Sequence, residues 1–413
     1  MTAVVVGGGF AGLLAARILA DHYDRVIVLE RGTPSKRRTV ASQANHLHVL
    51  LQKGREILEK LFPGLDGELA AAGAPEIDWG KDTAWLNPFG WAPQFPTSIR
   101  TRSCSRTFLE ERIRERVIKN HVIKYLEEAL VECPAFSLDG RRVSGVWYRT
   151  ESVRHFLPAD LVVLAHANQN SLTEWLGKIP IEKNEAVVGY ASCRYQLPPS
   201  VLAGSKQLYV QLAPPLRPRG GVICPVENGE YIVTLLSCDG KPGPTNELEF
   251  LKFSKGLPTP RFFEALLRGI PLSPFYRYQL SKSSWLKLGN ASLPEGVVVI
   301  GDAVCSLNPV YGQGMTMAAL EVEELAARVL KGRTWESGFQ KAVDELLRVP
   351  WELAGSENKV KGLGLKKRCS QLIFQHALRM ATQKPKVHRS FLEVMHMMQP
   401  PIRLMRSLVG LPA

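Results

Sequence analysis

The chain has 413 residues and a formal net charge of +13, and 45% of its residues are hydrophobic. This length exceeds what one ordinary hydrophobic core serves, so two intertwined domains are expected. The composition is that of a soluble globular protein. The sequence contains no run of about 18 apolar residues, so no membrane span is expected.

The first thirty residues hold a glycine-rich motif between two apolar, strand-like runs. Gly7, Gly9 and Gly12 form G-x-G-x-x-G ahead of a helix-like segment, and the second run ends at Glu30. In a βαβ unit, glycines at this spacing allow a tight turn, close approach of the backbone to a pyrophosphate, and packing of the helix on the strand. The pyrophosphate would lie at the helix N-terminus, and Glu30 would accept hydrogen bonds from a ribose. The motif therefore predicts a dinucleotide site.

The segment after this unit contains two histidines, His46 and His48. A metal site is not expected there, because no carboxylate or cysteine nearby completes a ligand set. A hydrogen-bonded structural pair remains an open alternative to a role beside a cofactor. A helix is predicted from Gly54 to Leu61.

Aromatic side chains gather in a Pro/Gly-rich stretch, and they line an apolar site or belong to the core: Trp79, Trp85, Phe89, Trp91 and Phe95. Periodicity does not decide between the two. Next, Ser105 is a predicted N-cap for a helix that carries Arg106 in its first turn.

Strands follow in the middle of the chain. Residues 122–132, 143–149 and 160–165 are predicted to return to the sheet of the first domain. Between 187 and about 279 the apolar residues alternate, which predicts an antiparallel sheet. Its clearest element is a hairpin over 222–236 with Asn228-Gly229 at the turn.

A second glycine-rich stretch lies near residue 300. A buried-strand pattern ends at Gly301-Asp302, and Gly312-Gln313-Gly314-Met315 opens a helix. Asp302 can hold a ribose or ribityl hydroxyl. The helix start would direct N–H groups at a negative centre, such as the N1–C2=O edge of a reduced flavin.

Together these motifs resemble the FAD-dependent monooxygenases of the aromatic-hydroxylase fold, of which p-hydroxybenzoate hydroxylase is the type. The branch with epoxidases and hydroxylases of polyketide and terpenoid pathways is the most similar. The motif Gln43-x-x-His46-x-His48 also resembles that branch. The resemblance to the family extends from residue 1 to about residue 335. The resemblance implies an α/β fold: a Rossmann-like FAD domain, an inserted antiparallel-sheet substrate domain and C-terminal helices.

Position by position, the resemblance implies a set of FAD contacts. Gly7, Gly9 and Gly12 would hold the pyrophosphate, and Glu30 with Arg31 the adenosine ribose. Gln43 and His46 would lie near the flavin, Arg106 at the phosphate or ribityl chain, and Asp302 at the ribityl. The residues Gly312, Gln313, Gly314 and Met315 would face the isoalloxazine.

The same resemblance implies a reaction and a division of the chain. NAD(P)H and O2 would be co-substrates, one oxygen atom would enter an apolar substrate, and no catalytic acid or base is identified. The FAD domain is expected at 1–50, 100–180 and 285–335, and the substrate domain at 51–99 and 181–284. Residues 336–413 would form a basic helical segment.

One segment departs from the family pattern. Where an Asp-Ala-Thr-Gly-Arg-like sequence is usual, this chain has Leu164-Ala165-His166-Ala167-Asn168. That segment normally lies by the FAD and helps to receive the nicotinamide. A second hypothesis is therefore a non-redox cyclase or isomerase that uses FAD as a scaffold, or does without it.

The C-terminal part carries most of the positive charge. From Lys359 onward, eleven Lys or Arg residues face one acid, Glu393, and eleven minus one leaves +10. A solvated helical face is the first interpretation; weak contact with an anionic membrane surface or a carrier protein is the second. Nucleic acid is disfavoured, because basic charge alone reads no bases.

The ends and the cysteines bear on location. The chain starts directly with a strand-like run, so no secretory signal is expected and a cytoplasmic location is predicted. The seven cysteines are scattered without C-x-x-C, which favours free thiols.

Overall fold

The computed structural model describes residues 1–33, 45–165, 169–214, 217–241, 243–329, 335–355 and 365–410. Five parallel strands form a central sheet in the order β18-β11-β1-β2-β7. Their bounds are β1 (Thr2–Val6), β2 (Arg25–Leu29), β7 (Ile123–Leu126), β11 (Leu161–Leu164) and β18 (Val297–Val299). Four of these strands are almost continuously apolar and buried, as expected for a parallel sheet between helical layers.

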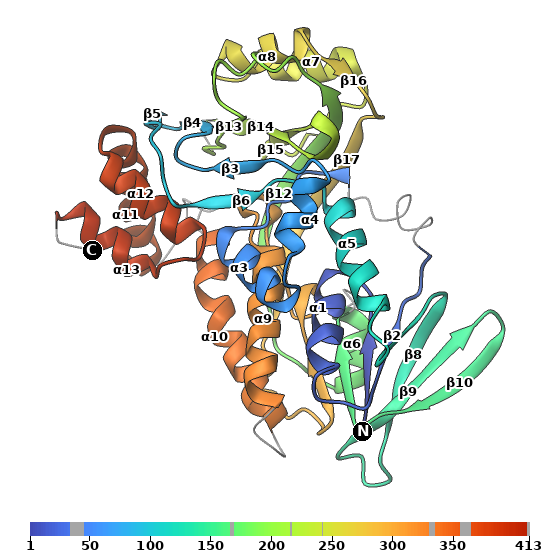
Figure 1. Ribbon diagram of the computed structural model, residues 1–413. Helices are drawn as coiled ribbons and strands as arrows, with labels where there is room; N and C mark the ends of the chain where they lie inside the picture. The colour runs from blue at the N-terminus through green and yellow to red at the C-terminus, as the bar shows by residue number, and fades with distance from the viewer. Residues whose placement is uncertain are drawn as a thin grey trace.

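Two helices from opposite ends of the chain pack together beside this sheet (Figure 1): α1 (Phe10–Leu19) and α9 (Gly314–Val329). Helix α1 approaches its own strand so closely that a Cβ on Gly12 would lie 1.9 Å from the carbonyl oxygen of Gly7. Only glycine permits this contact. The edge strand β18 is covered by α10 (Trp335–Gly355), whose Gln340 side chain pairs with both backbone groups of Val299 at 2.7 and 3.1 Å.

A second, larger sheet has the order β19-β17-β12-β15-β14-β13-β4-β5, with β16 paired to β12. Its bounds are β4 (Thr83–Asn87), β5 (Gly90–Trp91), β12 (Ile181–Gln196), β13 (Gln207–Val210), β14 (Arg219–Pro225), β15 (Tyr231–Ser237), β16 (Ile270–Pro271), β17 (Tyr276–Leu286) and β19 (Cys305–Ser306). The predicted hairpin is confirmed as β14–β15, with Asn228 at φ 62°.

Side chains alternate between the two faces of this sheet. On β12, Ala191, Cys193 and Tyr195 pack under α7 (Glu247–Lys255) and α8 (Pro260–Leu267), which cap the upper end in Figure 1. Val188 and Tyr190 point to the other face and join a separate apolar cluster. The alternation therefore sends two sets of residues to two different environments.

One topological prediction was wrong in part. Within 122–149 only β7 joins the central sheet; β8 (Ala129–Phe136), β9 (Val143–Thr150) and β10 (Val153–Pro158) form their own antiparallel sheet. The connection between β8 and β9 is a short turn around Asp139-Gly140, which permits antiparallel pairing and not a place in a parallel sheet. Figure 1 shows this sheet as an arm that projects from the body.

The remaining elements connect the two sheets. They are α3 (Gln52–Leu61), α4 (Leu65–Ala71), β3 (Glu76–Asp78), β6 (Arg100–Arg102), α5 (Arg106–Ile118) and α6 (Gln169–Leu176). Among the described residues, no helix combines the length and apolarity that a bilayer crossing needs.

Three C-terminal helices pack on the aromatic stretch: α11 (Leu365–Gln383), α12 (Pro385–Met395) and α13 (Pro401–Leu408). Trp79 and Trp85 are buried beneath them, so these two belong to a core, whereas Phe89 and Trp91 are exposed. His388 and His396 are buried in the same core, and the ring of His388 contacts Trp85, Phe95 and Phe391.

The glycine contact in the first turn predicts a large effect of one methyl group. Gly12→Ala should destabilise the protein by about 1–3 kcal/mol, because the new Cβ must displace the Gly7 carbonyl. The matched control is Gly67→Ala in α4, where a Cβ meets nothing within 4 Å and helix propensity should add up to about 1 kcal/mol. Urea unfolding measures both, and a neutral Gly12→Ala would contradict the packing.

The buried histidines predict a loss of stability in acid. Burial lowers the pKa of His388 from 6.5 to about 4. Between these values the unfolded chain binds the proton and the folded one does not, so stability is full above pH 6.5 and falls toward pH 4. The slope is at most about 1.4 kcal/mol per pH unit for one such group.

His388→Phe keeps a ring at this position and removes the titration. The variant should lose less stability than the wild type between neutral pH and the acid end of that window, measured by urea unfolding at both. Equal losses would show that the His388 ring is not held in its neutral form.

Candidate functional site: two neighbouring glycine turns

The first glycine turn connects β1 to α1 and is open on one side. Gly7 has φ 100°, a conformation that favours glycine, and Gly9 is the N-cap of α1. A Cβ on Gly9 would meet nothing within 4 Å, whereas one on Gly8 would collide with the ring of Tyr125. Within the described ranges no side chain caps α1, so its first N–H groups can bind an anion.

Glu30 lies at the end of β2 and faces this turn. Its carboxylate accepts hydrogen bonds from the Gly8 N–H at 2.7 Å and the Gly32 N–H at 3.1 Å. The neighbouring Arg31 is exposed. The acid at the tip of the second strand is therefore beside the open turn, as the motif predicts.

The second glycine turn lies directly against the first. Gly301 has φ 66°, and a Cβ there would be 2.8 Å from the Cβ of Ala11 in α1. Glu321 of α9 holds the turn from below, accepting the Gly301 N–H at 2.5 Å. Burial raises the pKa of Glu321 to about 8, so this carboxyl is largely protonated at neutral pH. The two motifs from opposite ends of the chain thus form one site.

Asp302 and Arg106 interact electrostatically across this site. Asp302 is accessible to solvent, yet desolvation by the surrounding protein raises its pKa while Arg106 opposes the shift. Desolvation alone would lower the pKa of Arg106, but Glu110 and Asp302 together raise it.

His48 holds Arg106 in place. Its Nδ1 donates to the carbonyl oxygen of His46 at 2.9 Å, which leaves Nε2 as an acceptor for Arg106 Nη1 at 3.3 Å. Burial, followed by the charge of Arg106, lowers the pKa of His48 to about 3, so this imidazole stays neutral. Arg106 Nε donates to Glu110 at 2.8 Å, and Ser105 caps the helix as predicted.

The turn before α9 completes the site. Gly312 has φ 64°, with the Cβ of Val49 3.4 Å from its would-be Cβ, and a Cβ on Gly314 would meet nothing within 4 Å. Gln313 is buried, and its Oε1 has no hydrogen-bond partner within the described part of the chain. Met315 is buried in the first turn of α9.

Two of the expected contacts need comment. Gln43 and residues 166–168 of the altered segment lie outside the described residues. His46 is described: its Nδ1 lies 2.7 Å from Ser192 Oγ, which in turn lies 2.7 Å from Thr234 Oγ1. Sequence analysis missed Ser192 and Thr234, although the strand alternation that places both beside Tyr190 was a usable signal.

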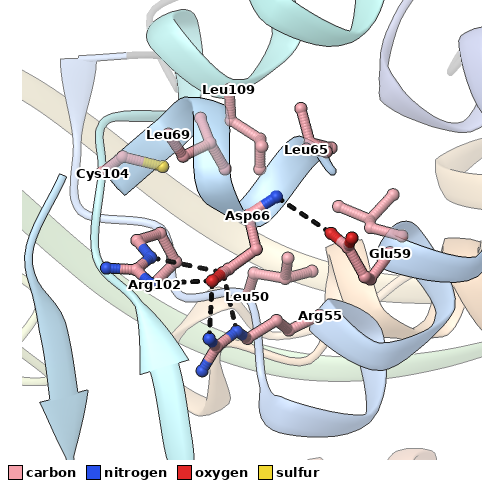
Figure 2. Close-up of a pocket in the computed structure, with 10 residues that line it drawn as sticks. Leu50, Arg55, Glu59, Leu65, Asp66, Leu69, Arg102, Cys104 and Leu109 are labelled. Carbon is pink, nitrogen blue, oxygen red and sulfur yellow. Dashed lines mark hydrogen bonds and ion pairs between the residues drawn. The ribbon is translucent and has the colours of Figure 1, made fainter. Parts of the chain in front are cut away.

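A small pocket bounded by α3, α4 and β6 is structural (Figure 2). Arg55 and Arg102 both donate two hydrogen bonds to the carboxylate of Asp66, over distances from 2.7 to 3.2 Å. Burial would raise the pKa of Asp66, but the two arginines lower it. The charged groups satisfy one another and join α3, α4 and β6, so this pocket has no free charge to offer a ligand.

Comparison with known proteins identifies the family. Residues 2–66 match the family described as FAD binding domain. Over 353 residues the chain is 33% identical to Protein Rv3254 of Mycobacterium tuberculosis, covering 80% of this chain and 73% of the relative. The chain belongs to this family of FAD-dependent flavoproteins with the aromatic-hydroxylase fold.

Solved structures show the same fold. The flavin-dependent brominase Bmp2 matches with a TM-score of 0.74 at 15% identity, covering 99% of both chains. PqsL, a probable FAD-dependent monooxygenase from Pseudomonas aeruginosa, gives 0.66 at 15%, covering 95% of this chain and 99% of its own. The Diels-Alderase PyrE3 gives 0.64 at 16%, covering 96% and 80%.

The residues of this flavoprotein fit FAD. The open sides of Gly9 and Gly314 are spaces that any side chain would fill, and each lies at the N-terminus of a helix. Glu30 and Asp302 would supply acceptors for the ribose and ribityl hydroxyls, and Arg106 would supply a donor for a phosphate or the ribityl chain. The assignment of each residue to each group remains a prediction.

Arg106 provides a direct test of that assignment. Arg106→Ala should weaken FAD binding by about 10- to 100-fold, because a hydrogen bond to a charged phosphate contributes about 1.5–3 kcal/mol. The matched control is Arg112→Ala on the same helix, whose arginine pairs with Glu115 near the surface. Titration of the apoprotein with FAD, followed by flavin fluorescence, measures both. Equal FAD affinities in the two variants would show that Arg106 does not bind FAD.

Proposed function

We propose that this flavoprotein is a monooxygenase that inserts one oxygen atom into a bulky apolar natural product, such as a polyketide or a terpenoid. NAD(P)H and O2 are the proposed co-substrates. The reaction is an epoxidation or a hydroxylation.

One observation carries the proposal: an apolar face of the large sheet meets the turn where the flavin ring is predicted. Tyr190, Val222 and Leu236 of this face form one cluster, against which Tyr278 and Val310 pack. Val310 lies two residues before Gly312, where the Gly312–Met315 turn begins. An apolar substrate on this face would therefore lie beside the isoalloxazine.

The chain contributes orientation and exclusion of water. Bound FAD would supply the redox chemistry, taking electrons from NAD(P)H and activating O2. The N-terminus of α9 would place positive potential near the isoalloxazine, and Arg106 would do so near the FAD phosphates. His46 and His48 remain neutral because burial lowers their pKa values to about 4 and about 3. The buried cluster of Tyr190, Val222 and Leu236 would exclude water from the place where the substrate reacts.

A second candidate is a cyclase or isomerase of natural-product biosynthesis that uses FAD as a scaffold. Two observations favour it. The segment from Leu164 to Asn170 lacks the acid and the glycine usual in the family, and a protein of the same fold, PyrE3, is a Diels-Alderase.

Spectroscopy separates the two candidates. A monooxygenase should be yellow when purified or reconstituted with FAD, should bleach when NADPH or NADH is added without air, and should regain colour with O2. A scaffold enzyme should keep its oxidised spectrum under the same treatment and turn over without O2. If the protein cannot be reconstituted with FAD, the monooxygenase proposal is wrong.

We propose that the basic C-terminal helices contact an anionic membrane surface weakly. The membrane would then be the source of the apolar substrate. On α13, Ile402 and Met405 are exposed one turn apart, and Arg406 is exposed next to them. Apolar side chains with neighbouring cations suit the interface of an anionic bilayer. A carrier protein of acidic surface is the alternative partner.

Vesicle flotation tests this contact. The protein should float partly with anionic vesicles at low salt and not at high salt, and Ile402→Ser/Met405→Ser should reduce flotation. The control is Leu248→Ser on α7, an apolar residue that is even more exposed than Ile402 and Met405 but lies on another element. Flotation that resists salt, or equal loss in the control, would contradict the proposal.

A further inference from the structure

His46 is buried on the apolar face of the large sheet, at the end of a chain of hydroxyl groups. Its ring lies between Tyr190 and Tyr278, with centroids 5.9 and 6.0 Å away, and it is 4% exposed. Its Nδ1 is 2.7 Å from Ser192 Oγ, and Ser192 Oγ is 2.7 Å from Thr234 Oγ1. The backbone N–H of Leu47 donates to Thr234 Oγ1 at 3.4 Å.

The number of satisfied groups favours one direction for these hydrogen bonds. The Leu47 N–H occupies a lone pair of Thr234 Oγ1, and among the described residues the Thr234 proton has one acceptor within reach, Ser192 Oγ. Ser192 therefore accepts from Thr234 and donates its own proton to His46 Nδ1. This order leaves one group unpartnered among the described residues, the Nε2–H of His46, whereas the opposite order leaves two, the Thr234 hydroxyl proton and the Nε2 lone pair. The neutral imidazole then carries its proton on Nε2.

The Nε2–H group of His46 has no partner within the described part of the chain. The hydroxyl of the adjacent Tyr190 is buried and unpartnered in the same way. Burial lowers the pKa of His46 to about 4, so the ring is an uncharged donor at neutral pH. An unsatisfied buried donor costs about 1–3 kcal/mol unless a ligand completes it.

The surroundings indicate what that ligand is. Leu47, Tyr278 and Val310 pack on the cluster that contains Tyr190, and Val310 precedes the predicted flavin-facing turn. An otherwise apolar molecule on this face would meet at least two buried potential donors without a partner among the described residues, His46 Nε2–H and the Tyr190 hydroxyl. A neutral oxygen acceptor suits such a donor, whereas an ammonium group or another N–H donor does not.

We propose that His46 Nε2–H binds a carbonyl or phenolic oxygen of the substrate, and that Ser192 and Thr234 hold the histidine in this tautomer. His46 is then a substrate-anchoring residue, and Ser192 and Thr234 are positioning residues. That the bound molecule is the substrate rests on the proposed function; the tautomer and the preference for an oxygen do not.

The tautomer is tested first, on the FAD-reconstituted holoenzyme labelled with ¹⁵N-histidine. His46 should show a protonated Nε2 and an unprotonated Nδ1 in its ring ¹⁵N shifts, whereas His48 should show the reverse. Ser192→Ala should move the proton of His46 toward Nδ1. A wild-type His46 that already carries its proton on Nδ1 would overturn the proposal.

Binding is tested with two probes of nearly equal shape, 2-acetylnaphthalene and 2-ethylnaphthalene, which differ in one carbonyl oxygen. The wild type should bind the ketone about tenfold more tightly than the hydrocarbon, in line with one hydrogen bond. His46→Asn, whose amide reaches only the Nδ1 position, should lose this preference, and His46→Gln, which restores an N–H near Nε2, should regain it. Affinity for the hydrocarbon should stay the same in all three proteins.

Equal binding of both probes by the wild type, or a preference that survives in His46→Asn, would overturn the proposal. Failure of the proposed function has a different signature. A flavin that NADPH and NADH do not bleach would reject the monooxygenase while the tautomer and the ketone preference remain.

Discussion

The site depends on a close approach between two turns from opposite ends of the chain. Gly301 leaves so little room beside α1 that a Cβ would come within 2.8 Å of Ala11, and Gly12 in turn rests on the carbonyl of Gly7. Each contact requires a glycine, because any side chain would push a helix away from a strand. The parallel sheet makes the approach possible, since β1 and β18 both end at the same edge and are separated only by β11.

The elements that could be predicted from sequence are those with local causes. The G-x-G-x-x-G unit, the Asn228-Gly229 hairpin and the Ser105 cap each depend on residues close in sequence, and the structure contains all three. The arm of β8, β9 and β10 could not be assigned in this way. Its strands have ordinary strand composition, and only the partner to which each one pairs separates an arm from a returning sheet.

The same limit applies to the candidate site. His46 was singled out by its motif, but its neighbours Ser192 and Thr234 come from two other strands that only the paired sheet brings side by side. The amphipathic C-terminal helices were predicted, whereas the surface that they cover was not. The stretch around Trp79 and Trp85 shows no periodicity that predicts which of its side chains are buried. Helices about three hundred residues later in the chain cover these two tryptophans, and the sequence does not indicate that contact.

The burial of His46 and His48 has a consequence for redox behaviour. Their pKa values of about 4 and about 3 lie below the range in which most cells keep their interior. Neither imidazole therefore gains a charge when the surrounding pH drifts by one or two units. A flavin held beside them would therefore experience no change in charge at these two rings when the cell acidifies. Its midpoint potential would not shift through protonation of His46 or His48.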